Sequence, residues 1–306
     1  FEDQVARAAH EAGIRALVGE VLYDFPSPNY GSPEQGLAFT KDLIRAWEND
    51  PLVSVAVEPH AVYTCSPDLL RACNEVAEEY QVPMIIHLSE SEDEVAQVKE
   101  RYSTSPVMHL EKLGLLTPHL IADHCVVLDD EEMDLLAERG VRVVHNPESN
   151  MKLASGVAPA VELLDRGVIM GLGTDGCASN NNLDMFGEMD TAAKLHKVYR
   201  LDPTVMGART VAQLAVRGGS KVLGLENQVG CLEPGKKADI IGLDLDRPHL
   251  TPLYNIYSHL VYAASAADVT LNIINGRVVM RNRELLTLDV ERIMADVRAI
   301  AKRIKQ

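Results

Sequence analysis

The strongest constraint on the fold is a regular alternation of short apolar runs with amphipathic helical segments. Six runs rich in branched residues are predicted to be strands, at residues 14–22, 53–59, 83–89, 120–127, 141–147 and 168–174. Helical patterns lie between them, such as 66–81, where Ser66 suits the N-cap and Pro67 the first turn. Strands that alternate with helices at this spacing indicate βαβ units and a parallel sheet. Because the runs are almost continuously apolar, we expect both faces of that sheet to be covered.

The pattern changes after a helical segment at 210–225. The region 225–285 holds short apolar runs separated by the turn sequences PGK and ING, which predicts a small β module. The last residues, 286–306, have an amphipathic helical pattern with a basic end that suits the helix dipole. The sequence therefore predicts an α/β domain over 1–224, a β segment over 225–285 and a C-terminal helix over 286–306.

Length, charge and cysteine content exclude several classes of protein. A chain of 306 residues with 46% hydrophobic and 24% charged residues can bury the core of a single large α/β domain. Its net charge of −16 argues against a nucleic-acid partner, which requires a basic face. No run is long enough for a membrane span, and no signal peptide is evident. Five cysteines without a C-x-x-C pair predict reduced thiols and a cytoplasmic location.

Imidazole and carboxylate side chains follow the carboxyl ends of four of the predicted strands. They are His60, His87 with Glu90 three residues later, His124 and Asp175. Each has a simpler explanation by itself: a buried histidine bonded to its neighbours, an acid at a helix start, or an Asx turn at Asp175. In a (β/α) barrel, however, the carboxyl ends of the strands meet at the face that houses catalysis. Together, residues from different βα units are difficult to explain as packing, and we interpret them as one site.

The residue types favour metal-assisted hydrolysis. A divalent metal ion lowers the pKa of bound water to roughly 7, and neutral imidazole and carboxylate groups suit zinc or iron. His87 and Asp175 are the candidate metal ligands, but a mononuclear site needs about two more and the sequence contains no H-x-H. His145, which ends another apolar run, is interpreted as shaping the following loop, and His196 as a packing or surface residue.

Four longer motifs carry a family resemblance. The segments IIHLSES, ADHCV, VVHNPESNMKLASGVAP and LGTDGCASNNNLDMF together resemble the amidohydrolase superfamily. Within it they are most similar to the 5′-methylthioadenosine/S-adenosylhomocysteine deaminases, over nearly the whole chain. The resemblance implies a (β/α)8 TIM-type barrel, of which strands three to eight are visible here, with a small β-sandwich formed by the C-terminal segment. It also implies one divalent metal ion, with zinc expected first and iron or manganese as alternatives. A homo-oligomer is plausible on the same grounds.

The resemblance also implies a role for each candidate residue. His87 and Asp175 would bind the metal, and Asp175 would pass a proton from the attacking water to the leaving ammonia. Glu90 would protonate the purine ring nitrogen as a general acid. His124 would orient and polarise the nucleophile, and His60 would contact the substrate. The implied reaction is the hydrolytic deamination of a 5′-modified adenosine to the inosine analogue, with Glu90 and Asp175 also binding the substrate.

Two departures from the family pattern affect these expectations. The H-x-H of the first barrel strand is absent, and so are strands one and two with the first half of the β-sandwich. We therefore expect the chain to be the C-terminal part of a longer protein, and to retain metal poorly and show little activity alone. In addition, the loop 23–41 contains no arginine and only Lys41 as a cation. Recognition of a substrate carboxylate is then in doubt, which favours methylthioadenosine or 5′-deoxyadenosine over S-adenosylhomocysteine.

Two other functions remain open from the sequence. One is another branch of the superfamily, such as a guanine deaminase or a triazine-type chlorohydrolase, although Glu90 favours protonation of a purine ring. The other is a catalytically inactive scaffold or fragment that binds a partner. The presence or absence of bound metal would distinguish the scaffold from the enzymes.

Overall fold

A six-stranded parallel sheet forms the centre of the protein, whose structure is a computed structural model describing residues 1–304. Its strands pair in sequence order: β1 Ala16–Leu22, β2 Val53–Pro59, β3 Met84–Leu88, β4 Leu120–His124, β5 Arg142–His145 and β6 Ile169–Leu172. All six predicted strands are therefore confirmed. Within residues 1–304, β1 and β6 are the two edges of the sheet and do not pair with each other, so the sheet is open rather than closed into a barrel.

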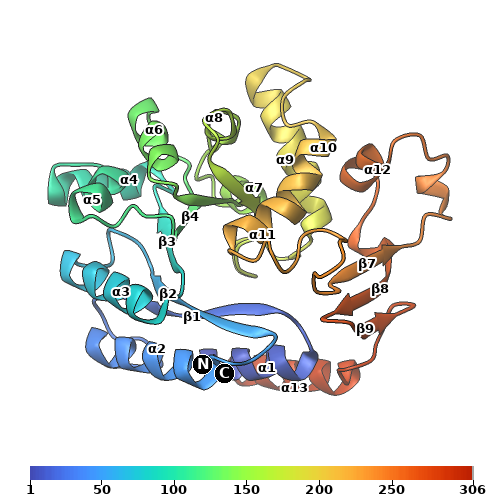
Figure 1. Cartoon of the computed structure of the whole chain (residues 1–306), viewed down its shortest axis with the longest axis horizontal. Helices are drawn as coiled ribbons and strands as arrows, with labels where there is room; N and C mark the ends of the chain where they lie inside the picture. The colour runs from blue at the N-terminus through green and yellow to red at the C-terminus, as the bar shows by residue number, and fades with distance from the viewer. Residues whose placement is uncertain (305–306) are drawn as a thin grey trace.

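Helices alternate with the strands, and most of them cover the outer face of the sheet (Figure 1). They are α1 Glu2–Ala12, α2 Pro33–Trp47, α3 Pro67–Tyr80, α4 Glu92–Tyr102, α5 Pro106–Leu113, α6 Asp130–Glu138, α7 Pro147–Lys152, α8 Ala160–Asp165 and α9 Met185–Arg200. The predicted cap of α3 is confirmed, because the Ser66 side chain accepts a hydrogen bond from the Leu69 backbone N–H. Helix α6 begins with a capping box between Asp129 and Glu132.

The two faces of the sheet differ in composition. Outward-facing residues such as Leu22, Val57 and Ile86 are buried against the helices and form the main core. The inner face instead lines a cavity with Glu58, His87 and Asp123 among apolar neighbours. The expectation that both faces are covered is thus correct for the outer face only. On the inner face, Ile169 is 39% exposed within the described part of the chain.

The predicted helix at 210–225 is present but interrupted. It consists of α10 Ala208–Gln213, a π-helical turn at Leu214–Gly218 and α11 Gly219–Val222. The turn lies where the backbone packs closely against β6, because a Cβ atom on Gly218 would collide with the carbonyl oxygen of Met170. The backbone of the π-helical turn therefore lies closer to the edge strand β6 than a side chain at Gly218 would allow.

The C-terminal region forms a separate antiparallel sheet. Its strands are β7 Ile240–Leu243, β8 Val269–Ile274, β9 Arg277–Arg281 and β10 Glu284–Leu285, paired in the order β10-β9-β8-β7. The β module is confirmed, but helix α12 Ile256–Tyr262 and two 3₁₀ turns, Pro248–Leu250 and Ala266–Asp268, were not predicted. Only one sheet of the expected sandwich lies in the described residues.

The final helix is α13 Val290–Ile304, drawn in red in Figure 1. Just before it, the Thr287 hydroxyl donates a hydrogen bond to the Ala12 carbonyl at 2.8 Å. None of its residues through Ile304 is buried. A search of the described residues finds no helix that is both long and apolar enough to cross a membrane.

Candidate functional site

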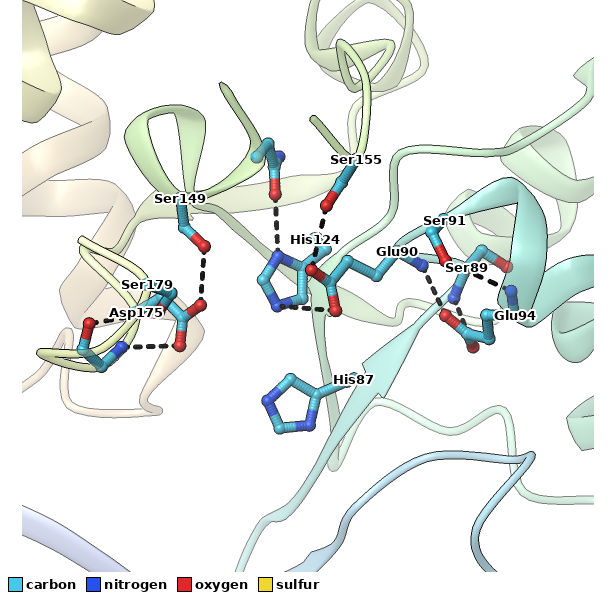
Figure 2. Close-up of polar contacts among 12 residues, drawn as sticks. His87, Ser89, Glu90, Ser91, Glu94, His124, Ser149, Ser155, Asp175 and Ser179 are labelled. Atoms are coloured by element: carbon cyan, nitrogen blue, oxygen red, sulfur yellow. Dashed lines mark hydrogen bonds and ion pairs between the residues drawn. The ribbon is translucent and has the colours of Figure 1, made fainter. Parts of the chain in front are cut away.

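The predicted site residues meet at the carboxyl ends of the parallel strands. The His87 ring lies 5.0 Å from the His60 ring and 5.5 Å from the His124 ring, measured between centroids. Figure 2 shows Asp175 on one side of the His87 and His124 rings and Glu90 on the other. The structure therefore brings side chains at or just after the carboxyl ends of β2, β3, β4 and β6 to one face of the sheet.

His87 is held by the neighbouring strand end. Its Nδ1 atom donates a hydrogen bond to the His60 carbonyl oxygen at 2.8 Å, and its backbone N–H donates to the same oxygen at 3.0 Å. A neutral ring bonded in this way has its lone pair on Nε2. The contact leaves Nε2 of His87 available as a donor atom for a ligand.

Glu90 and His124 form the closest acid–imidazole pair in the site. Glu90 Oε2 lies 3.9 Å from His124 Nε2, and the Ser155 hydroxyl donates to Glu90 Oε1 at 3.1 Å. On the far side of the ring, His124 Nδ1 lies 2.9 Å from Asn150 Oδ1. His124 is 1% exposed, so its ring orientation is determined by packing and by these contacts.

Asp175 combines a local turn contact with a contact to a distant segment. Its Oδ1 accepts a 2.6 Å hydrogen bond from the Gly176 N–H, and its Oδ2 accepts a 2.7 Å bond from the Ser149 hydroxyl. Burial acts to raise the pKa of Asp175, but hydrogen bonds from Ser179, Ser149 and Gly176 outweigh it and lower that pKa. The carboxylate is therefore stabilised in its ionised form.

His60 lies at the aromatic edge of the site. Its ring centroid is 5.0 Å from that of Tyr23 and 5.8 Å from that of Tyr63, and its Nδ1 lies 2.9 Å from Thr64 Oγ1. Burial, assisted by the neighbouring His87, lowers the pKa of His60 to about 4. This imidazole is consequently neutral at physiological pH and can contact a ligand without introducing charge.

Sequence reasoning missed a carboxylate that supports the Glu90 loop. Glu94, in the first turn of α4, accepts hydrogen bonds from the backbone N–H groups of Ser89 at 3.0 Å and Glu90 at 2.7 Å (Figure 2). Burial raises the pKa of Glu94 to about 7. In the sequence Glu94 has only the signature of a helix-start acid, so its contact with the preceding loop was not predictable.

A second missed group lies deeper on the inner face. Glu58 occupies the space that Gly19 leaves open on β1, because a Cβ atom at Gly19 would lie 2.5 Å from the Glu58 carboxyl carbon. Burial, and to a smaller extent the nearby Asp123, raise the pKa of Glu58 to about 7. The alternation of side chains along β2 places Glu58 on the inner face. In the sequence, the run 53–59 is almost continuously apolar, so Glu58 does not stand out as a site residue.

The side chains present fit part of a metal site. His87 and Asp175 offer an imidazole nitrogen and an ionised carboxylate, which are donors that zinc accepts. In residues 1–304 no group of three or more histidine, cysteine, aspartate or glutamate side chains is arranged to hold a metal ion. The described residues therefore supply two suitable donors and do not complete the donor set.

Comparisons with known proteins identify the class. A model described as "Amidohydrolase family" matches residues 2–279, and the chain belongs to this family. The chain is 61% identical over 305 residues to the 5-methylthioadenosine/S-adenosylhomocysteine deaminase of Syntrophobacter fumaroxidans, covering 100% of this chain and 70% of that protein.

Solved structures agree with this assignment. An adenosine deaminase from Xanthomonas campestris with bound zinc is 40% identical, with a TM-score of 0.97 and coverage of 100% of this chain and 70% of that one. The zinc complex of an atrazine chlorohydrolase from Arthrobacter aurescens is 27% identical, with a TM-score of 0.89 and coverage of 97% and 68%. The fold of this chain is thus shared by relatives that carry out different reactions.

Proposed function

We propose that the protein is a metal-dependent hydrolytic deaminase of 5′-modified adenosines, which converts substrate and water into the inosine analogue and ammonia. The observation that carries the proposal is the Glu90–His124 pair, 3.9 Å apart, next to His87 and Asp175. It offers a general acid for a purine ring nitrogen beside groups suited to water activation. The name of the Syntrophobacter relative, 61% identical across this chain, supports the same reaction.

Each side chain has a separate task in this proposal. Glu90 delivers a proton to the ring nitrogen as water attacks the carbon that carries the amino group. Asp175 accepts a proton from that water and transfers it to the departing amino group, which leaves as ammonia. The second proton of the water, carried on the new hydroxyl group, returns to the Glu90 carboxylate as the carbonyl group of the product forms. His124 orients the attacking water through Nε2, and His60 contacts the substrate with a neutral ring.

A divalent metal is the expected cofactor. When bound, such an ion lowers the pKa of water and so supplies a nucleophile at neutral pH. His87 and Asp175 are the residues of this chain proposed to hold it. Zinc is favoured over iron or manganese because the Xanthomonas and Arthrobacter structures are described with zinc.

The proposed substrates are adenosines without a carboxylate in the 5′ substituent. Lys41, the only cation in the loop region 23–41, is paired with Glu79 at 2.9 Å and lies over the Tyr80 ring. That lysine is therefore engaged on the outer helices and does not serve the site. Methylthioadenosine and 5′-deoxyadenosine are preferred over S-adenosylhomocysteine.

We also propose that this chain forms part of the barrel fold that the family shares. β1 to β6 correspond to strands three to eight of a (β/α)8 barrel over residues 1–224, with 225–285 as part of a β-sandwich and 286–306 as a C-terminal helix. The TM-score of 0.97 to the Xanthomonas enzyme supports this correspondence. A homo-oligomer in the cytoplasm is the proposed state of the protein.

Ammonia release from a defined panel tests the function. The purified protein is supplied with zinc, its metal content is measured, and it is assayed with methylthioadenosine, 5′-deoxyadenosine, S-adenosylhomocysteine, guanine and a chlorotriazine. We expect ammonia from the first two at a low rate, because the described residues do not complete the metal donor set, and a further loss of at least about 100-fold in Glu90→Gln. The matched control Glu100→Gln, in an exposed position of α4, should retain activity. Chloride release from the triazine, or metal-free protein that is indifferent to His87→Ala, would contradict the proposal.

A further inference from the structure

One short segment contacts all three acid–base side chains of the site. The segment consists of α7 and the residues that follow it, 147–155, and it lies after β5. Its polar contacts with these three side chains are Ser149 Oγ to Asp175 Oδ2 at 2.7 Å, Asn150 Oδ1 to His124 Nδ1 at 2.9 Å and Ser155 Oγ to Glu90 Oε1 at 3.1 Å. Figure 2 shows Ser149 and Ser155 pointing to their two different carboxylates. The three partners follow β6, β4 and β3, so the segment links three separate strand ends.

The segment is itself firmly placed. Ser149 and Asn150 are 0% exposed, and the backbone N–H of Ser155 donates to the Asn150 carbonyl at 2.9 Å. Pro147 begins the helix, and Gly156, with a positive φ of 129°, directly follows the segment. At Gly156 a Cβ atom would lie 2.8 Å from Val126, so only glycine allows this close approach. Because Ser149 and Asn150 are buried and held in place, they determine the orientation of the side chains that they contact.

The contacts of Asn150 and Ser155 determine where exchangeable protons lie. A carbonyl oxygen only accepts hydrogen bonds, so Asn150 Oδ1 requires the hydrogen of His124 on Nδ1. In the neutral ring the lone pair is then on Nε2, which faces Glu90 Oε2. While Ser155 donates to the other carboxyl oxygen, Oε1, that oxygen acts as an acceptor, and this arrangement favours Oε2 as the position of a proton on Glu90. The segment 147–155 thus determines which Glu90 oxygen carries the proton and which His124 nitrogen accepts a hydrogen bond.

We propose that Ser149, Asn150 and Ser155 are positioning residues that fix the protonation geometry of the active site. Asn150 selects the Nδ1–H tautomer of His124, Ser155 directs the proton of Glu90 to Oε2, and Ser149 holds the rotamer of Asp175. The catalytic meaning of this geometry rests on the proposed deaminase function. The geometry itself is a property of the free protein and can be measured without turnover.

The tautomer of His124 provides the first test. Protein labelled with ¹⁵N-histidine is examined by NMR at a pH where the ring is neutral, and His124→Gln identifies the resonances. We expect a pyrrole-type shift for Nδ1 and a pyridine-type shift for Nε2. Asn150→Leu should give a mixture of tautomers, whereas Asn150→Asp, which keeps the acceptor, should retain the Nδ1–H form. A pyridine-type Nδ1 in the unmodified protein overturns the proposal, even if the leucine variant does not fold.

Kinetics of Ser155 variants provide the second test. We expect Ser155→Ala to lower kcat about 10-fold with KM changed less than about twofold, and Ser155→Thr to restore kcat. Thr40→Val is the matched control, because Thr40 is a 0% exposed residue of α2 whose hydroxyl bonds to the Gly36 carbonyl. Equal kcat in Ser155→Ala and the control, or no rescue by threonine, overturns the role of Ser155. If the expected tautomer is found but no deamination occurs, the proposed function fails and the positioning role of Asn150 stands.

Discussion

Two strand-end histidines with the same burial have opposite surroundings. His124 ends β4 and His145 ends β5, and each is 1% exposed. His124 lies 3.9 Å from the Glu90 carboxylate and its ring is 5.5 Å from that of His87. His145 instead places Nε2 2.9 Å from Nε2 of His196 on α9. Neither position in the sequence nor burial therefore identifies a site histidine.

The difference arises from one backbone angle. In register, His124 is opposite Leu88 and His145 is opposite Leu172, so regular strand geometry directs both away from the inner face. His145 keeps this direction and meets α9. His124 has a φ of 71°, which rotates its Cβ about the N–Cα bond and turns the side chain to the site. The left-handed backbone conformation of His124 thus distinguishes this site histidine from His145, whose ring packs against α9.

The electrostatic environment of the packing pair follows from its burial. Burial, followed by the neighbouring His196, lowers the pKa of His145 to about 3, and burial lowers the pKa of His196 to about 4. Both rings are neutral above pH 5, so one N–H donates to the other ring nitrogen. Among the described residues, Nδ1 of His145 has no hydrogen-bond partner. We interpret the pair as structural.

The largest expected difference is in activity. His124→Gln should lower kcat/KM by about 10²–10⁴-fold, the range for loss of a positioned acid–base group, because Glu90 loses its partner. His145→Gln should leave kcat/KM of the folded protein within about threefold, because its ring forms its hydrogen bond with His196 on α9 and not with a site residue. Ammonia release from methylthioadenosine measures both. Equal losses in the two variants would remove the distinction between the histidines.

Acid should destabilise the protein through the packing pair. The folded pKa values of about 3 and about 4 lie below the ordinary histidine value of 6.5, so their stabilisation is present above pH 6.5 and is lost as the pH falls below it. We expect the free energy of unfolding to fall by on the order of 5 kcal/mol between pH 7 and pH 4.5 from this pair. Urea unfolding of His145→Leu/His196→Leu should show a flatter pH dependence. The exposed control His119→Gln should keep the slope, and an unchanged slope in the double variant would contradict the assignment.

A smaller effect of opposite sign is expected from Glu188, which is carried by α9 together with His196. Burial, with repulsion from Glu148, raises the pKa of Glu188 to about 8, above the ordinary value of 4.5. Its stabilisation is present below pH 4.5 and is lost as the pH rises to 8. Glu188→Gln should therefore gain about 1–2 kcal/mol relative to the unmodified protein between pH 5 and pH 8.5. Urea midpoints at the two pH values measure this, with Glu100→Gln as control. No relative gain would show that Glu188 is ionised in the folded protein.

Much of the architecture was predictable because its causes are local. The six strands, the Ser66 cap and the β character of 225–285 follow from apolar periodicity, capping chemistry and turn sequences. The π-helical turn at Leu214–Gly218 was not predicted, because it lies at a close contact with the Met170 carbonyl, which is distant in sequence. Helix α12 was missed within a region that otherwise reads as strands and turns.

The sequence by itself determined which residue types follow each strand, since strand ends and helix starts are encoded by neighbouring residues. It thereby predicted that His60, His87, Glu90, His124 and Asp175 would gather at one face. Only the tertiary structure decided which atoms of these side chains face one another. The φ of His124 and the contacts from Ser149, Asn150 and Ser155 involve segments that are distant in sequence. Side-chain direction and proton position depend on such packing, which residue order alone does not contain.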